Sequence, residues 1–383
     1  MINTLDIRKK DIKRVIKSLD ITPTMFKNAE EKYKNIGAFL NKNGLNVDIS
    51  LQGSFAIGTA IKPYSQGRDK SYDVDVVCVF GDKTIQSQEA RERLLSVLND
   101  SEVYSDKITE WPKCFTLDYA KIGDYDFSID LVPTRRKEEN VPVTGANSFY
   151  LTDILEIAIK EKKYDWYTIN PKGYQKWFCD INSKFALYNR EFRMNQVFEN
   201  NKHIFAKVED IPEYFNKSAL QEAIQILKRS RDVYFSKIRD DDNKPASIII
   251  TTFAALTAKK YPENIDSIDL AMYIINDLRL YSRKEIHSEI DSPIIKYNGK
   301  WEFLNPVNSE DNLLDSWNKN ELVPKKFFEW IEKAGLDLNE IISKDGINYV
   351  DVLGNSFGNE IVNKLFGRER VEEINHGVKP YHD

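Results

Sequence analysis

Apolar residues in the first part of the chain follow two different spacings, one helical and one strand-like. From Phe26 to Leu40 they recur every three or four positions, which predicts an amphipathic helix that Thr24 caps and Asn43-Gly44 ends. Apolar runs bounded by Gly or Asp predict strands. The strands are expected at 47–55 (with a break at Gly53-Ser54), 72–80, 115–119 and 126–132, with a helix at 88–98 and a hairpin turn at 121–124.

Beyond Pro133 the pattern changes, and helical spacing dominates from about Ser148 onward. Ser218 and Gln221 form a capping box that opens a long helix with apolar residues on one face. Another helix is expected to begin near Ser247, and later ones at 265–278, 311–317 and 325–334. The sequence therefore predicts a mixed α/β domain over residues 1–190 and a helical domain over residues 191–383.

Composition and charge narrow the classes of function. The chain has 383 residues, of which 41% are apolar, so about two domains with a buried core are expected and a disordered protein or coiled coil is excluded. The 60 acidic residues outnumber the 55 basic ones. A long nucleic acid is therefore not the expected partner, whereas a small anionic ligand is compatible with this balance.

Cysteine and histidine positions give no sign of a metal or disulfide framework. The three cysteines lie far apart and the four histidines do not cluster with them, so neither structural zinc nor disulfides are expected. The N-terminus has no apolar signal region, and the most apolar stretch, 246–258, is too short to span a bilayer. We therefore expect a cytoplasmic protein without a membrane partner.

Two carboxylates on one predicted strand are the first candidate for chemistry. Asp73 and Asp75 lie two residues apart, so they share one face of the strand, with Cα atoms roughly 6.5–7 Å apart. Carboxylates this close repel each other unless a cation lies between them, and Mg²⁺ prefers such oxygen ligands together with substrate phosphates. The alternative is a strand end whose acids are simply solvated.

The Gly53-Ser54 break just beyond an apolar strand is the second candidate. A glycine allows the backbone to approach an anion closely, and a serine hydroxyl with neighbouring amides can hold a phosphate. An ordinary turn is the alternative. Two better-known motifs do not fit, because Thr59-Ala60 replaces the Lys-Ser/Thr of a phosphate loop and Gly53-Ser54-Phe55 is not a nucleophile elbow.

Asp130 is a third acid, and it lies within an apolar strand where a charge is costly without a counterion. If this strand neighbours the strand of Asp73, three carboxylates converge. Such a site fits two cations about 3.5–4 Å apart, one activating a hydroxyl and one holding the phosphate that is displaced.

Taken in order, Gly53-Ser54, Asp73-x-Asp75 and Asp130 resemble the signature of the polymerase-β-like nucleotidyltransferase superfamily. The segments around them are more similar to the cGAS/DncV-like nucleotidyltransferases (CD-NTases) of CBASS, a bacterial anti-phage signalling system. That resemblance implies a polymerase-β-like core, a mixed sheet with flanking helices, followed by a helical C-terminal domain of oligoadenylate-synthase type. The similar segments are 51–59, 72–78, 170–178, 220–232, 305–307 and 376–380.

The resemblance also implies roles for individual residues. Asp73, Asp75 and Asp130 would hold two Mg²⁺ ions, with Asp130 also the base toward a ribose hydroxyl. The donor triphosphate would contact Gln52, Gly53, Ser54, Lys228 and Ser247, and Asn170 and Tyr174 are candidates for the region of the base. Without the resemblance, Lys228 is equally a solvated lysine and Ser247 equally a helix N-cap.

The implied reaction is attack by a ribose hydroxyl on the α-phosphate of ATP or of GTP, UTP or CTP, with release of pyrophosphate, repeated to close a cyclic di- or trinucleotide. The partners implied are these triphosphates and an effector protein that senses the product, and a monomer is expected. Activation by double-stranded DNA is not expected, because the cysteines and histidines of the metal-binding insertion in the animal relative are absent.

Three alternatives remain open at this stage. The first is a synthase of linear oligonucleotides. The second is a nucleotidyltransferase that acts on tRNA, protein or a small molecule, which would share the Gly-Ser and Asp-x-Asp elements. The third is a scaffold that binds nucleotides but has lost the chemistry, although such proteins typically lose an acid or the serine, and here all are present.

Overall fold

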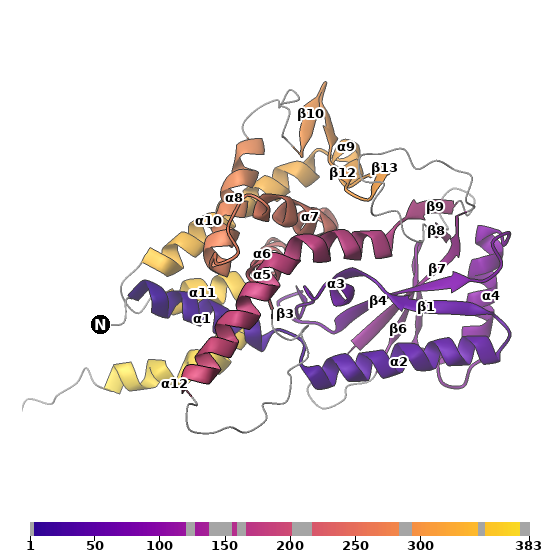
Figure 1. Ribbon diagram of the computed structural model, residues 1–383, viewed down its shortest axis with the longest axis horizontal. Coiled ribbons are helices and arrows are strands. Elements are labelled where there is room, and N and C mark those ends of the chain that lie inside the picture. Colours follow the sequence, from indigo (N-terminus) through magenta and orange to yellow (C-terminus); the bar gives the residue numbers. More distant parts are fainter. Residues whose placement is uncertain are drawn as a thin grey trace, which may run out of the picture.

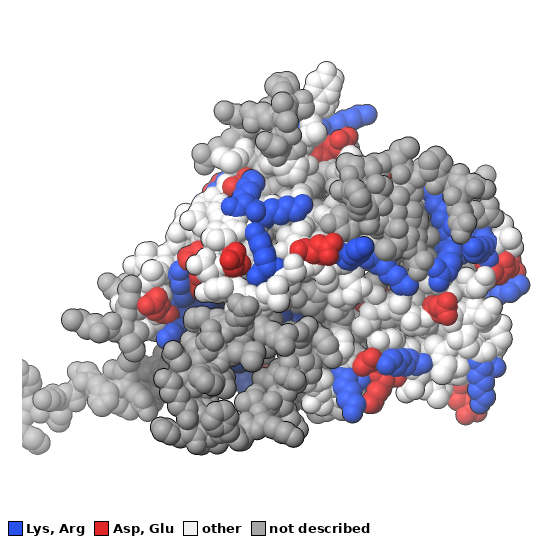
Figure 2. All heavy atoms as spheres, viewed as in Figure 1, with Lys and Arg blue, Asp and Glu red and all other residues white. Residues whose placement is uncertain are grey.

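The computed structural model describes residues 4–119, 127–137, 155–158, 166–200, 217–282, 293–343 and 349–375. Figure 1 shows a sheet with two helices packed against it, next to a larger group of helices. This α+β architecture, a mixed sheet followed by a helical region, is the predicted fold. Figure 2 shows basic and acidic side chains interspersed on one face of the molecule.

The central sheet has a mixed topology that follows the order β1-β4-β7-β6-β5, with β8 and β9 continuing from β7. Its middle strands, β4 and β7, are parallel, and all its other pairs are antiparallel. The strands are β1 (Val47–Leu51), β4 (Tyr72–Phe80), β5 (Ile108–Glu110), β6 (Phe115–Asp118), β7 (Phe127–Arg136), β8 (Leu155–Ala158) and β9 (Trp166–Ile169).

Alternation along β4 gives the sheet two different faces. Val74, Val76 and Cys78 are buried in one apolar cluster with helices α2 (Pro23–Lys42) and α4 (Ser87–Asn99). Because successive side chains of a strand point to opposite faces, Asp73 and Asp75 lie on the other face. Because the apolar face of β4 packs against α2 and α4, the face that carries the two acids points away from these helices.

Helix α6 lies at the centre of the helical region and is buried along most of its length. The N-terminal helix α1 belongs to this region as well, because Ile12, Val15 and Ile16 are buried in the same cluster as α6 and α10. The helices are α1 (Thr4–Ser18), α5 (Pro171–Asn200), α6 (Ala219–Ile238), α7 (Ser247–Ala258), α8 (Ser267–Tyr281), α9 (Asp315–Lys319), α10 (Leu322–Ser343), α11 (Tyr349–Phe357) and α12 (Asn359–Asn375).

Three short hairpins complete the described fold. One lies between α3 and β4 in sequence and packs against α6, and the other two lie between α8 and α9 in sequence. They are β2 (Tyr64–Ser65) with β3 (Arg68–Asp69), β10 (Ile295–Tyr297) with β11 (Lys300–Glu302), and β12 (Leu304–Asn305) with β13 (Asn308–Asn312). Among the helices of the described residues, none has the length and apolarity needed to cross a bilayer.

Most predicted elements are confirmed, but three details are wrong. The cap of α2 is Thr22 rather than Thr24, because the Thr22 hydroxyl accepts from the Met25 N–H at 3.3 Å. The strand expected at 47–55 ends at Leu51, because Gly53–Ala56 forms the short helix α3.

The helix expected at 311–317 is the third error. Residues Asn308–Asn312 form β13, and the helix α9 begins only at Asp315. The side-chain oxygen of Asn312, Oδ1, accepts from the backbone N–H groups of Phe303 and Leu314, which ties the end of β13 to the residue before β12. The turn predicted at 121–124 and the tail from 376 lie outside the described residues. The boundary near residue 190 stays a prediction, and α5 is continuous there.

Candidate active site

The turn after β1 requires glycine for two reasons. The backbone N–H of Gln52 donates to the carbonyl of Asp75 at 2.9 Å, which holds the turn against β4. Gly53 has φ +61°, a conformation that L side chains rarely adopt, and a Cβ atom there would lie 2.2 Å from Asp75 Oδ2. The glycine therefore lets Ser54 and Asp75 lie in one site.

Gly53→Ala tests this close approach. The added methyl group displaces the Asp75 carboxylate or shifts the turn, so we expect the rate of the reaction that the resemblance implies to fall about a hundred-fold. The α2–β4 core is untouched, and the thermal midpoint should drop by only a few degrees. Gly67→Ala is the matched control, because Gly67 also has positive φ (+77°) but has nothing within 4 Å of the position of its Cβ. Equal activity losses in the two variants would contradict the steric argument.

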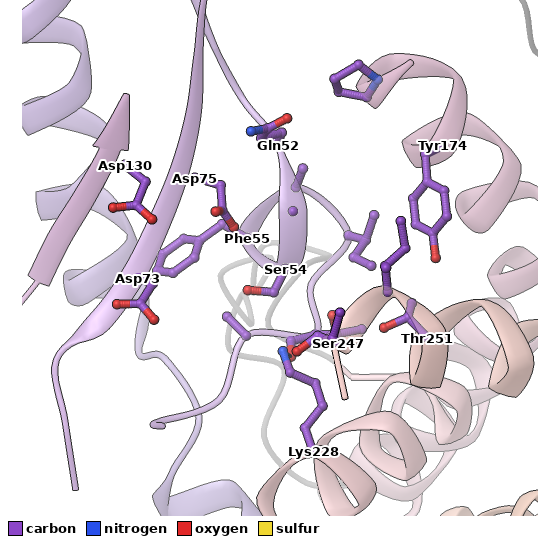
Figure 3. Close-up of a pocket in the computed structure, with 18 of the residues that line it drawn as sticks. Gln52, Ser54, Phe55, Asp73, Asp75, Asp130, Tyr174, Lys228, Ser247 and Thr251 are labelled. Atoms are coloured by element: carbon purple, nitrogen blue, oxygen red, sulfur yellow. Dashed lines mark hydrogen bonds between the residues drawn. The ribbon is translucent and has the colours of Figure 1, made fainter. Parts of the chain in front are cut away.

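The parallel pairing of β4 and β7 brings the third acid to the other two. In this register Asp75 lies opposite Asp130 and Asp73 lies opposite Ser128. The Ser128 hydroxyl donates to Asp73 Oδ1 at 2.7 Å, and Thr116 Oγ1 of β6 donates to Asp130 Oδ1 at 2.5 Å. Figure 3 shows the three carboxylates on the same side of the sheet.

The electrostatics of this group favour a bound cation. Burial, and then the charges of Asp130 and Asp73, raise the pKa of Asp75 to about 7. Burial also raises the pKa values of Asp73 and Asp130, against the hydrogen bonds from Ser128 and Thr116, respectively, that lower them. Burial and mutual repulsion make the ionised state of these carboxylates unfavourable, and a bound cation would offset that cost.

As they lie, the three acids do not form a closed cage. Within the described residues, no group of three His, Cys, Asp or Glu side chains stands ready to hold a metal ion. Mg²⁺ does not require one, since it is usually bound by one or two carboxylates together with water and substrate phosphates. The donor set therefore fits a divalent cation whose coordination the substrate completes.

The opposite wall comes from the helical region. Lys228 of α6 is buried, and its Nζ donates to the carbonyl of Thr59 at 3.0 Å. Burial and the charge of Arg231 lower the pKa of Lys228 to about 8, although Asp232, Asp75 and Asp73 act in the other direction. The alternative of a solvated lysine is therefore wrong.

The alternative that Ser247 is the N-cap of α7 is wrong. It is the first residue of α7, and the cap position belongs to Ala246. Its hydroxyl oxygen accepts from Arg231 Nη1 at 2.9 Å. Arg231 also donates to Asp232, so a buried ion pair supports the beginning of α7.

All the predicted site residues line one cavity of about 560 Å³. Figure 3 shows the acids on one side of it, Lys228 and Ser247 on another, and the Ser54 hydroxyl between them. The eight are Gln52, Gly53, Ser54, Asp73, Asp75, Asp130, Lys228 and Ser247.

The two candidates for the base region, Asn170 and Tyr174, also line this cavity. The Asn170 amide group donates to the carbonyl of Val307 at 3.1 Å, and its carbonyl oxygen accepts from the Gly173 N–H at the start of α5. The Tyr174 hydroxyl lies 2.8 Å from Thr252 Oγ1.

Sequence reasoning missed several residues of the site. Ser128 had a usable signal, since it precedes Asp130 by two positions and so shares its strand face. No sequence pattern pointed to Thr116, because its contact with Asp130 depends on the pairing of β6 with β7. Arg231 and Asp232 lie in the segment 220–232 that carries part of the resemblance, but nothing local distinguished them from surface charges.

Comparisons with known proteins agree with this geometry. Residues 8–182 match the family model described as the Second Messenger Oligonucleotide or Dinucleotide Synthetase domain, SMODS. A protein of Roseivirga ehrenbergii named c-di-GMP synthase is 28% identical over 376 residues, which cover 94% of this chain and 87% of that protein. Over residues 8–182 the chain is therefore a cGAS/DncV-like nucleotidyltransferase.

Solved structures extend the similarity of this CD-NTase to the whole fold. The Bradyrhizobium diazoefficiens CD-NTase CdnG in complex with GTP has a TM-score of 0.69 at 18% identity, covering 95% of this chain and 100% of that one. The Vibrio cholerae DncV cyclic AMP-GMP synthase in complex with nonhydrolyzable GTP has a TM-score of 0.54 at 15% identity, covering 94% and 86%. The predicted polymerase-β-like core with a helical C-terminal region is thereby confirmed for this CD-NTase.

Proposed function

We propose that this CD-NTase joins nucleoside triphosphates, GTP among them, into a cyclic di- or trinucleotide and releases pyrophosphate. The observation that carries the proposal is the single cavity, in which three carboxylates from two adjacent strands face Lys228 and the turn of Ser54. The similarity to a protein named c-di-GMP synthase favours guanine as a base.

Each transfer begins with a ribose hydroxyl near Asp130. The hydroxyl oxygen forms a bond to the α-phosphorus of a donor triphosphate, the bond from that phosphorus to the bridging oxygen breaks, and pyrophosphate leaves. Asp130 accepts the hydroxyl proton, for which a carboxyl with a raised pKa is suited. Thr116 orients this carboxylate through its hydrogen bond.

The other residues of the cavity position and neutralise the donor. Ser54 and the amides of its turn contact the triphosphate, and the Lys228 ammonium offsets its charge. Asp73, Asp75 and Asp130 would hold two Mg²⁺ ions, which supply neutralisation of the charge on the phosphates. Positioning and charge neutralisation suffice for this displacement without a covalent nucleophile.

A second transfer within the same cavity closes the ring. The linear intermediate presents its own hydroxyl to the α-phosphorus at its triphosphate end, so no protein or nucleic acid acceptor is needed. We further propose that the cyclic product activates an anti-phage effector protein and that the enzyme acts as a monomer without double-stranded DNA.

Product analysis tests this function. The protein is incubated with MgCl₂ and the four ribonucleoside triphosphates without any acceptor, and the phosphatase-treated mixture is analysed by mass spectrometry. We expect a phosphatase-resistant cyclic product that contains guanine, and none in the presence of EDTA. A linear product with a free end would instead indicate a linear synthase. Label transferred only to added tRNA or protein would indicate the macromolecular alternative, and no turnover of any kind would indicate a scaffold.

A further inference from the structure

A row of polar side chains on one face of α6 holds the segment that follows the Ser54 turn. This α6 donor row consists of Lys217, just before the helix, and Gln221, Gln225 and Lys228 within it. Their terminal nitrogens donate to four consecutive backbone carbonyls. The bonds are Gln221 to Ile57 at 2.9 Å, Lys217 to Gly58 at 2.9 Å, Lys228 to Thr59 at 3.0 Å and Gln225 to Ala60 at 2.7 Å.

The spacing of the row explains how it contacts four consecutive residues. Its members are three or four positions apart, so they lie along one face of the helix. Buried carbonyl groups need hydrogen-bond partners, and here side chains supply them in place of a neighbouring strand. The sheet region and the helical region are therefore joined through backbone atoms directly beside the candidate active site.

A hydrogen-bonded turn links the residues that the α6 donor row contacts to Ser54. The Thr59 N–H donates to the carbonyl of Ser54 at 2.9 Å, so the ends of the turn between them are tied together. Gly58 has φ +69°, and a Cβ atom there would lie 2.5 Å from Gln221 Nε2. The amide of Gln221 thus packs directly against the backbone of this turn.

Gln221 has a second contact that explains its orientation. Its side-chain oxygen accepts from the backbone N–H of Ser218 at 3.0 Å, which is half of the capping box of α6. The oxygen therefore faces the start of the helix and the Nε2 group faces the carbonyl of Ile57. A single amide ties the first turn of α6 to the turn of Ser54.

We propose that Gln221 is a positioning residue for nucleotidyl transfer: it sets the orientation of the Ser54 turn relative to the three acids without contacting the substrate itself. It does not belong to the residues that line the cavity, whereas Lys228 of the same row does. The proposal rests on the proposed function, since it concerns the same reaction.

The test is a double-mutant cycle between Gln221→Met and Ser54→Ala, measured as kcat and KM for GTP in product formation. Met keeps the length of the side chain and removes both its donor and the oxygen that accepts from Ser218. We expect Gln221→Met alone to lower kcat/KM about ten- to a hundred-fold. In the Ser54→Ala background the same change should lower it several-fold less than in the wild type, because the Ser54 hydroxyl that it helps to position is gone.

Ser218→Ala is the matched control, because it removes the hydroxyl that caps α6 and leaves the Gln221 donor in place. It should lower the thermal midpoint but leave kcat/KM within about two-fold of the wild type well below that midpoint. If Gln221→Met does not fold, Gly58→Ala takes its place in the cycle, since its methyl group displaces the same amide.

The outcomes separate the positioning role from the proposed function. Losses that multiply fully in the double variant, or a loss with Ser218→Ala as large as that with Gln221→Met, would overturn the positioning role. A wild-type protein that forms no cyclic product would overturn the proposed function instead.

Discussion

Asp75→Asn abolishes product formation, with an expected loss of at least about a thousand-fold, although the folded protein becomes more stable at alkaline pH. Asparagine keeps the shape of the side chain but removes the negative charge that would hold a cation. Product is measured by chromatography after incubation with MgCl₂ and GTP. Asp82→Asn is the control, since Asp82 is an exposed aspartate just beyond β4 whose carboxylate accepts hydrogen bonds from the neighbouring Thr84 and Ile85.

The stability effect of this variant follows from the raised pKa of Asp75, which is about 7 in the folded protein against 3.8 for an ordinary aspartate. The folded state disfavours the ionised carboxylate, so the wild type loses stability as the pH rises from about 4 through 7, and the asparagine variant does not have this loss. Without metal and in EDTA, the thermal midpoint of the variant should exceed that of the wild type at pH 8 and match it near pH 4. Wild-type turnover, or a difference in midpoint that does not depend on pH, would contradict the role given to Asp75.

Arg229→Met should lower the free energy of unfolding by about 3–5 kcal/mol, the usual cost of removing one partner of a buried ion pair. Arg229 of α6 is 1% exposed and donates to Asp69 Oδ1 at 2.6 Å. It also donates to the carbonyls of Lys62 and Phe357 at 2.9 and 2.7 Å, and it lies over the ring of Tyr64. The substitution leaves a carboxylate and two carbonyl groups without these bonds.

Urea denaturation measures this effect, and Arg93→Met is the matched control. Arg93 is exposed and pairs only with Glu89 one turn away in the contacts described for it, so its replacement should cost no more than about 0.5 kcal/mol. Arg229 binds Asp69 of the β2–β3 hairpin, which shortly precedes Asp73 in sequence. The loss of Arg229 should therefore also lower activity. Equal shifts in the urea midpoint for the two variants would show that the Arg229 network contributes little.

The position of Lys228 connects the two regions of the molecule. It belongs to the α6 donor row and lines the cavity, and Asp75 and Asp73 both raise its pKa against the effect of burial. The residue that would meet a triphosphate is thus one of those that hold the backbone after Ser54. Under the proposed function, substrate binding and the position of that backbone would therefore be coupled through one side chain.

Local patterns in the sequence were enough to predict several features of the candidate site. Period-two alternation determined that Asp73 and Asp75 share a strand face, and the Gly53-Ser54 break marked the turn beside them. The capping box at Ser218 and Gln221 gave the start of α6. These features depend on neighbours within a few positions, so the chain alone determines them.

The tertiary structure decided which distant residues meet. The parallel register of β4 and β7 joins Asp130 to Asp75, and β6 adds Thr116, although no local spacing relates these strands. Gln221 shows the difference most clearly: the sequence identifies it as a cap, but only the packing of α6 against residues 57–60 makes it a support for Ser54. Strand register and helix packing depend on the burial of whole faces, which a short segment of sequence does not specify.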